Sequence, residues 1–574
     1  MRLPENIIYG TADKPPISTL IILALQQMSF LGVYLVISPL FARHFGLNQD
    51  QSLQLISATL LASGFGVVLQ TAKFWGIGSG YFCPLQATSS TFAGLLLAKS
   101  SSGLGAMFGM VTVIGLAQMF FAFVFQRLKG VFTVQIAGLA VLLIGLGLGY
   151  YGIKLILQVE PGLSLSQQGL LCLLTLGTMI AFNVWSNGNL RLFSAFLGLL
   201  VGLVSSSYMD IIPESSWETF HNAPLFYLPT PMNIGWSFDP ESLLPAIATG
   251  LFLALHSFGA LVAAQKFNDA DWKRPDLQSV KQGILSEGIT NLVNSLLNGI
   301  PLTSSGGAVS LAASTGCTSR YLAYWLATFM VIIAFIPKAI IIWQILPLSV
   351  MGGALIFLAS FTALSGLQVM ASRLLDNRKT LALGIGLILG ISYEPLMASY
   401  QQIYPQVLKH LLFSSVSLGT FSAVLLSFLF QYKNHTKEIQ SFNTQQSSLD
   451  DVVIYLEKQG KRWGARPEVV HKAEYATWQA FEILVENGLI NEQANNNDNK
   501  IDIHTLFNEY TFTVILNYTG QILPLTTHRP THEDFLNNDD AVIQMAGYLI
   551  YRLADRVKTG HNGSQCQLFL IFND

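Results

Sequence analysis

The chain has 574 residues, of which 51% are hydrophobic and only 11% are charged. Soluble domains contain about 25% charged residues, so this composition argues against a soluble enzyme and favours a protein that crosses a membrane many times. The 31 Lys and Arg residues nearly balance the 33 Asp and Glu residues, which excludes a broadly basic nucleic-acid-binding protein. The 4 cysteines are scattered, so we predict neither a disulfide framework nor a metal site.

Charged residues are absent from long stretches before Lys433, and these stretches predict membrane-spanning helices. A helix needs about 20 apolar residues to cross a bilayer. With Pro301 dividing one long stretch, we predict fourteen spans, at about 18–42, 51–72, 79–98, 103–126, 131–153, 166–186, 190–209, 242–265, 282–300, 302–317, 320–341, 345–370, 380–397 and 410–432.

Basic residues between these spans test the topology, because cytoplasmic loops carry an excess of Lys and Arg. With the N-terminus in the cytoplasm, the cytoplasmic loops hold fifteen basic residues: Arg2, Lys14, Lys73, Arg127, Lys129, Arg191, Lys266, Lys273, Arg274, Lys281, Arg320, Arg373, Arg378, Lys379 and Lys433. The outer loops hold five, which are Arg43, Lys99, Lys154, Lys338 and Lys409. We therefore predict a multi-pass transporter domain over residues 1–433, with both termini in the cytoplasm.

The composition changes after Lys433, where charged and polar residues become frequent. Residues 434–449 are predicted to be a polar linker, and residues 450–574 a cytosolic α/β domain. The patterns predict a helix, a turn, two strands, a helix and a last strand, at 466–487, 491–499, 501–507, 511–516, 541–556 and 566–572. This order favours a two-layer sandwich.

Two segments inside the predicted spans depart from a plain apolar helix. They are GSGYFCPLQATSSTF (78–92) and GIPLTSSGGAVSLAASTG (299–316), and each has a Pro followed by Thr-Ser-Ser. Non-helical backbone in a membrane needs protein or a cavity to satisfy its hydrogen bonds, and paired interruptions mark the central site of a transporter. They fall in spans three and ten, as two inverted seven-span repeats require. The alternative is close helix packing through small residues.

The membrane part resembles the nucleobase–ascorbate transporters, particularly their bacterial xanthine and urate branch, from about residue 19 to residue 430. The motifs that carry the resemblance are ALQQ (24–27), GSG…LQATSSTF (78–92), GLAVLLIGLGL (138–148), PLT…TG…SR (301–320) and LPLSVMGGAL (346–355). The resemblance implies a core bundle and a gate bundle of seven inverted spans each, with short antiparallel strands in spans three and ten. It also implies a symporter that takes up a nucleobase with a cation, usually H⁺. We expect a homodimer in the bacterial inner membrane.

Several positions that this family uses to bind substrate are changed here. The resemblance places His256 at a substrate-binding Glu in span eight, Gly307 at a base-reading Gln or Glu in span ten, and Ser90 at an aromatic position in span three. The pair Gln26-Gln27 replaces a Gln-His pair in span one. Because a site that hydrogen-bonds a base edge discriminates strongly, these changes leave the exact solute open.

The candidate site combines hydroxyl, amide and glycine positions with an ionisable side chain. The predicted substrate-binding residues are Gln27, Gln86, Ser89, Ser90, Phe92, His256, Thr303, Ser304, Ser305, Gly306 and Gly307. An ionisable group inside a membrane marks a functional site, and His changes charge near physiological pH, so His256 is the predicted proton-coupling residue. The alternative for His256 is a neutral His that bonds two helices together. Glu287 in span nine is the second coupling candidate, and we favour it as a partner for the half-helix backbone.

The tail resembles the anti-sigma-factor kinases of the GHKL ATPase class in WQAFEILVEN (478–487), YTFTVILNYTGQILPL (510–525) and MAGYLIYRLADRVKTG…CQLFLIF (545–572). In that class a Glu and an Asn four residues apart hold Mg²⁺, whereas Glu482 and Asn487 are five apart. Asn517 occupies the position at which members of that class have a carboxylate that binds adenine. We therefore predict a degenerate domain that regulates or dimerises, without a cofactor and without ATP hydrolysis.

Three functions remain open at this point. The first is secondary active, H⁺-coupled uptake of a nucleobase or a related small polar solute, which makes the chain a transporter and not an enzyme. The second is an anion carrier or channel of the same fold, because hydroxyls, glycines and helix N-termini favour negative charge. The third is a transporter-like sensor that signals through its tail.

Overall fold

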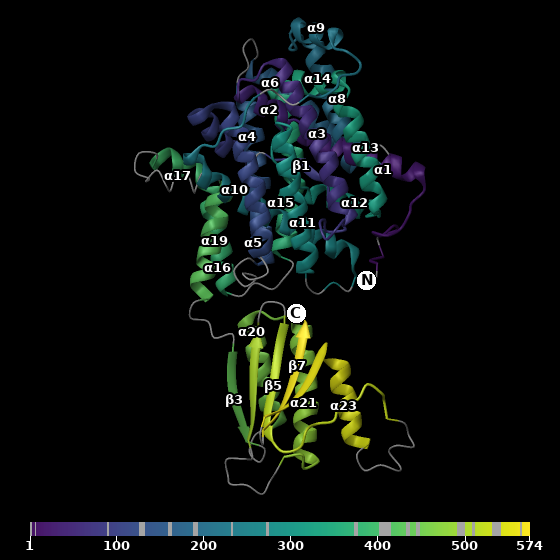
Figure 1. The fold of residues 1–574 in the computed structure, drawn as a ribbon, viewed down its shortest axis with the longest axis vertical. Coiled ribbons are helices and arrows are strands. Elements are labelled where there is room, and N and C mark those ends of the chain that lie inside the picture. The colour runs from purple at the N-terminus through teal and green to yellow at the C-terminus, as the bar shows by residue number, and fades with distance from the viewer. Residues whose placement is uncertain are drawn as a thin grey trace. The chain divides into compact units, whose positions relative to one another are not determined.

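The computed structural model describes residues 3–5, 7–88, 91–124, 133–158, 164–186, 193–230, 234–270, 272, 275–371, 377–400, 415–431, 437–443, 448–490, 500–507, 511–530, 541–562 and 565–573. The chain divides into two compact units. The first comprises Met1–Ser372 and Ala382–Leu426, and the second comprises Arg373–Leu381 and Ser427–Asp574. The first unit is built of helices, and the second contains a sheet (Figure 1).

Helices cover at least part of every predicted span. They are α1 (Ile17–Tyr34), α2 (Ile37–His44), α3 (Gln49–Ala72), α4 (Phe92–Val124), α5 (Val134–Leu157), α6 (Leu165–Val184), α8 (Ser194–Tyr208), α9 (Glu214–Asn222), α10 (Pro240–Asn268), α11 (Leu277–Leu296), α12 (Gly306–Ser314), α13 (Arg320–Ala334), α14 (Pro337–Ile345), α15 (Leu348–Met370), α16 (Asn377–Ile391), α17 (Tyr393–Tyr400) and α19 (Ser415–Gln431). Of the helical segments described, 7 are long and apolar enough to cross a membrane, or 8 if the pair α13–α14 is one bent span. The chain is therefore a mainly helical, multi-pass membrane protein, although these lengths alone support fewer than fourteen spans.

Four predicted spans differ in shape from a straight helix. The span at 320–341 consists of α13 and α14, which are bent by 82° relative to each other. Pro337 begins α14, and a Pro disfavours helical geometry in the residue before it, which explains the break. The first span is divided into α1 and α2. The third and fourth spans share α4, which is interrupted at Gly103 with φ 81° and ψ −172°, a conformation essentially restricted to glycine.

Small residues allow α5 and α15 to pack in close contact. A Cβ added to Gly145 would lie 2.4 Å from the backbone nitrogen of Ala363, and one added to Gly138 would lie 2.4 Å from that of Met370. In a membrane the hydrophobic effect does not drive helices together, so such close backbone packing supplies much of the association. This contact between α5 and α15 fixes the position of α15. The hydroxyl of Ser365 on α15 lies 3.2 Å from the place where a Cβ of Gly306 would be.

Two short strands interrupt the helices, and they confirm the strands expected in spans three and ten. Strand β1 (Leu85–Ala87) pairs antiparallel with β2 (Leu302–Ser304), and Gln86 lies opposite Thr303. Each strand directly follows a proline, Pro84 or Pro301, which has no N–H to continue a helix. The pairing satisfies backbone groups that would otherwise be unpaired inside the bundle.

The second unit contains a five-stranded antiparallel sheet in the order β3-β4-β5-β7-β6 (Figure 1). The strands are β3 (Lys437–Asn443), β4 (Lys500–Phe507), β5 (Thr511–Thr519), β6 (Arg556–Asn562) and β7 (Gln565–Asn573), and the helices α20 (Leu449–Trp463), α21 (Pro467–Glu486) and α23 (Ala541–Leu553) contribute to the same hydrophobic core. Buried and partly exposed residues alternate along β4, β5 and β7, as in a sheet covered by helices on one face. Each helix and strand predicted for this domain is present.

The structure corrects the predicted linker at 434–449, because residues 437–443 form the edge strand β3. Only Phe442 of this strand is buried, so its sequence lacks the alternation by which a strand is recognised. Helix α20 and strand β6 were not predicted either. The predicted Asn-rich turn at 491–499 lies outside the described residues.

Candidate substrate site

Three of the predicted site residues meet where α10 passes the β1–β2 pair. His256 lies on α10 and is 1% exposed. Its Nδ1 atom lies 2.8 Å from the hydroxyl oxygen of Thr303 in β2. Opposite Thr303 is Gln86 of β1, whose buried Oε1 atom has no hydrogen-bond partner within the described residues. An imidazole and a hydroxyl are therefore in contact, and the strand position opposite them carries an unpaired amide oxygen.

Glu287 on α11 holds the end of β2 from the other side. Its Oε2 atom accepts hydrogen bonds from the backbone N–H of Ser304 at 2.9 Å, from the Ser304 hydroxyl at 2.7 Å, and from the hydroxyl of Ser257. Its Oε1 atom accepts one from Nε2 of Gln118 at 2.6 Å. Glu287 is fully buried, so this set of four donors is what satisfies its two oxygens. Glu287 thus bonds backbone of strand β2, and its role as a partner of half-helix backbone stays a prediction.

A third polar side chain, Asn291 of α11, completes the support of β2. It donates to the carbonyl of Leu302 at 2.9 Å and accepts from the N–H of Leu302 at 2.8 Å. It also donates to Oε1 of Gln118 at 2.7 Å. Sequence reasoning missed Asn291 and Gln118. Their signal was an amide side chain in the middle of an apolar span, where each polar group needs a partner.

Aromatic rings pack against the start of α12. A Cβ added to Gly307 would lie 2.8 Å from Cζ of Phe30, so only a glycine leaves room for this ring. Phe30 also makes edge-to-face contacts with Tyr34 and Phe361, with ring centroids 5.9 and 5.8 Å apart. The polar groups of β1 and β2 thus lie in the same part of the bundle as an aromatic cluster from α1 and α15.

Several predicted residues already have partners within the protein. Ser305 is the N-cap of α12, and its hydroxyl accepts from the N–H of Ala308 at 3.2 Å. Gln27 donates to the carbonyl of Ala308, also at 3.2 Å, while its Oε1 atom is buried without a partner in the described part of the chain. The hydroxyl of Ser304 is bonded to Glu287. Gly306 begins α12 at this N-cap.

Three further predicted positions cannot be placed in the same way. Ser89 and Ser90 lie outside the described residues. Phe92 begins α4, and only its backbone is described. Elsewhere in the described ranges, no three His, Cys, Asp or Glu side chains converge as metal ligands would.

A small inner chamber lies beside the β1–β2 pair, with a volume of about 10 Å³. Its lining includes Gln86 of β1 and Leu302 of β2, together with residues of α1, α3 and α13. A space of this size holds about one water molecule, so a larger solute requires the chamber to widen.

A polar centre built on two interrupted segments inside a bundle of apolar helices defines the chain as a membrane transport protein. Residues 18–396 match the model of the family Xan_ur_permease, which is described as a permease family. The chain belongs to this family, and its nucleobase–ascorbate resemblance is thereby confirmed. It is a permease and not an enzyme.

The chain is similar to two curated bacterial proteins over most of its membrane part. It is 27% identical over 447 residues to the xanthine permease XanP of Escherichia coli (strain K12), covering 74% of this chain and 95% of XanP. It is 28% identical over 429 residues to the nucleobase transporter PlUacP of Paenibacillus larvae, covering 72% of this chain and 95% of PlUacP. Among solved structures, murine Slc26a9, an anion transporter in the inward-facing state, matches 76% of this chain and 72% of its own, with 13% identity and a TM-score of 0.47.

Proposed function

We propose that this permease is a secondary active transporter of a nucleobase or a closely related planar, polar solute. The observation that carries the proposal is the meeting of His256, Thr303 and Gln86 at the β1–β2 pair, inside the region that matches the family. The names of the relatives XanP, a xanthine permease, and PlUacP, a nucleobase transporter, support this class of solute.

The chemistry of the site suits a base. The edge of a nucleobase carries N–H donors next to carbonyl acceptors, and the unpaired Oε1 atom of Gln86 accepts such an N–H. The hydroxyl of Thr303 and the ring of His256 can each donate or accept. The rings of Phe30 and Phe361 favour a flat, apolar face. A compact anion, which is the second function considered, would use the donors but not the rings.

Coupling to H⁺ is assigned to His256, with Glu287 as the residue that holds β2. Both are ionisable groups inside the bundle, and an intramembrane ionisable residue is expected to serve transport. His256 bonds a strand residue of the solute site, whereas Glu287 is surrounded by four internal donors. A proton bound at His256 would therefore interact directly with the bound solute.

The architecture proposed for this activity is fourteen spans in two inverted repeats, with both termini in the cytoplasm of a bacterial cell. Two pairings support the repeat: β1 with β2, and α5 with α15, each joining predicted spans that are seven apart. The C-terminal domain, which we extend to include β3, is proposed to be a regulatory module of a homodimer in the inner membrane. Residues 1–433 form the transporter domain in this proposal.

Uptake into proteoliposomes tests the function. We expect radiolabelled xanthine or uracil to accumulate when an inward H⁺ gradient is imposed. Thr303→Val should raise the half-saturating concentration by about tenfold, the cost of one lost hydrogen bond in a buried site, while the matched Thr328→Val on the exposed side of α13 should not. Uptake of sulfate or bicarbonate with no uptake of any base would contradict the proposal.

A further inference from the structure

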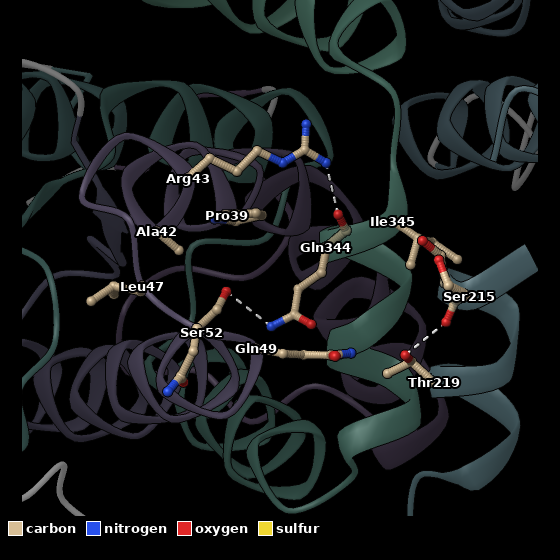
Figure 2. A pocket seen from close by; sticks show the side chains of 12 residues that line it. Pro39, Ala42, Arg43, Leu47, Gln49, Ser52, Ser215, Thr219, Gln344 and Ile345 are labelled. Carbon is tan, nitrogen blue, oxygen red and sulfur yellow. Dashed lines mark hydrogen bonds between the residues drawn. The ribbon is translucent and has the colours of Figure 1, made fainter. Parts of the chain in front are cut away.

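A second and larger cavity lies away from the β1–β2 pair. It has a volume of about 310 Å³, at the lower end of the usual range for small-molecule sites, and its lining comes from α2, α3, α9 and α14 and the residues beside them. Figure 2 shows Gln344, Gln49 and Ser52 around its centre and Ser215 and Thr219 at one side. On the proposed topology it opens at the outer face, because the α2–α3 and α8–α10 connections are outer loops. We call it the outer pocket.

The outer pocket and the inner chamber are lined by the same three pieces of the chain. Helix α3 gives Ser52 to the outer pocket and Ser63 to the inner chamber, a separation of about 16 Å along the helix. The α1–α2 segment gives Leu35 to the chamber and Pro39 to the pocket, and the bent α13–α14 pair gives Met330 and Gln344 in the same way. The same three segments therefore line both cavities, with the chamber beside the β1–β2 pair and the outer pocket further along each segment.

The lining of the outer pocket is chemically suited to the edge of a lactam. It contains no Asp or Glu, and Arg43 is its single charged residue. Gln344 donates from Nε2 to the hydroxyl of Ser52 at 3.0 Å, and its Oε1 atom stays available as an acceptor. The Gln49 side chain makes no hydrogen bond within the described residues and presents a carbonyl next to an NH₂ group. That pair matches a neighbouring N–H and C=O on a heterocycle.

The same lining is poorly suited to a compact inorganic anion. Arg43 uses its Nη2 atom to donate to the carbonyls of Gln344, at 2.8 Å, and of Leu346, at 3.1 Å, which ties it to the end of α14 (Figure 2). Strong anion sites gather several charged or backbone donors on one point. Here the remaining groups are neutral amides and hydroxyls that offer acceptors as well as donors.

We propose that the outer pocket is an entry site, which binds a planar lactam-bearing solute before it reaches the inner chamber. The inference rests on the proposed function for the class of solute, but the site itself is distinct from the β1–β2 pair. The side-chain amides of Gln49 and Gln344 hydrogen-bond the lactam edge. The residues of α3 that lie between the two cavities separate the entry site from the inner chamber.

Cysteine protection tests the entry site directly. All four native cysteines are buried, so a membrane-impermeant maleimide added to right-side-out vesicles should react mainly with an introduced thiol. Ser216→Cys places the thiol in the outer pocket, and Glu218→Cys places a control on the exposed side of the same helix α9. We expect xanthine to slow labelling of Ser216→Cys several-fold and to leave Glu218→Cys unchanged. Ser215→Cys, which also lines the outer pocket, gives a second reporter if Ser216→Cys does not fold.

The protection is then repeated with His256→Ala, whose loss of inner binding is measured separately with radiolabelled xanthine. Protection that persists in His256→Ala supports the entry site. Protection that vanishes with His256→Ala overturns it, because the slowing was then a conformational effect of the inner site. Protection by sulfate but not by xanthine also overturns it. Normal xanthine uptake with no protection refutes the entry site alone, whereas absence of uptake and of inner binding refutes the proposed function.

Discussion

Ser304 gives both its backbone N–H and its hydroxyl to one oxygen of Glu287, at 2.9 and 2.7 Å. Since Ser304 is the last residue of β2, these two hydrogen bonds to α11 keep the strand next to β1. Each residue of β2 is in fact held by a different polar side chain: Leu302 by Asn291, Thr303 by His256, and Ser304 by Glu287. The strand is therefore fixed by three pairings that can be broken separately.

The first prediction is that Glu287→Gln destabilises the membrane domain. The backbone N–H of Ser304 and the NH₂ group of Gln118 can only donate, so the NH₂ of a glutamine would meet one of these two donors in either orientation. Each buried donor left without an acceptor costs about 1–3 kcal/mol. We expect a lower melting temperature in detergent and a large loss of uptake. Glu394→Gln, at an exposed position of α17, is the matched control, and equal behaviour of the two variants would disprove the role of Glu287.

The second prediction concerns coupling through His256. A glutamine at this position can still bond Thr303 but cannot titrate between about pH 5 and 8. His256→Gln should therefore retain solute exchange across the membrane while losing accumulation driven by an H⁺ gradient. Counterflow and gradient-driven uptake are measured on the same proteoliposomes. If accumulation and its pH profile match those of the original chain, His256 is a packing residue, and Glu287 becomes the next coupling candidate.

The third prediction tests the contact between α5 and α15. A methyl group at Gly145 would overlap the backbone of Ala363, whereas nothing lies within 4 Å of a Cβ at Gly147. Overpacking of this kind costs about 1–3 kcal/mol. Gly145→Ala should thus lower the melting temperature measured by size-exclusion chromatography after heating, and Gly147→Ala should leave it unchanged or raise it. The opposite order would show that this helix pair is not closely packed.

The fourth prediction is a pH dependence of the C-terminal domain. Burial, together with the positive charge of Lys437, lowers the pKa of His504 below its usual value of about 6.5, although Asp502 acts in the opposite direction. The unfolded chain therefore binds a proton more readily than the folded domain, so this contribution to stability is present above about pH 6.5 and is lost as the pH falls below it.

Urea unfolding of residues 437–574 at several pH values measures this effect. The midpoint should fall on acidification, and His504→Gln should reduce that fall. His561→Gln, at an exposed position on β6, is the control and should behave like the original domain. A pH profile that His504→Gln does not change would assign the acid sensitivity to another group.

The fifth prediction concerns where the tail can be removed. A chain that ends at Gln431 loses the whole sheet, and we expect it to insert, fold and bind xanthine, since the β1–β2 site lies in the other unit. A chain that ends at Asn443 keeps β3 without β4, its partner along seven residues, and leaves an unpaired strand that should aggregate. Comparison of the two by size-exclusion chromatography and binding decides the matter. Loss of all binding in the shorter chain would make the tail part of the site.

The sequence carried enough information to locate the centre of the transporter but not to assemble it. The prolines and Thr-Ser-Ser runs indicated where the helices are interrupted, and the family resemblance indicated the strands. What joins them was not readable, because Gln118 and Asn291 are 173 residues apart and a single sequence contains no sign of their contact. The position of the Phe30 ring against Gly307 was hidden for the same reason.

Edges and bends were the other features that the patterns did not predict. Strand β3 is exposed along most of its length, so its pairing with β4 determines its structure rather than any alternation of its own. The 82° bend before Pro337 lies within an apolar stretch that has the length of a single span. The outer pocket is formed by segments around residues 43, 52, 215 and 344, and no local motif marks it.

The pairing of β1 with β2 also determines when this protein can finish folding. Leu85 and Ser304 are 219 residues apart in the chain. Since ribosomes add about 5–20 residues per second, β1 is synthesised roughly 10–45 s before its partner β2. During that interval its backbone groups have no strand to bond, and an unpaired N–H or C=O in hydrocarbon costs several kcal/mol. The first half of the membrane domain therefore cannot settle as an independent unit in the lipid. Its completion depends on the late arrival of a three-residue segment from the second half.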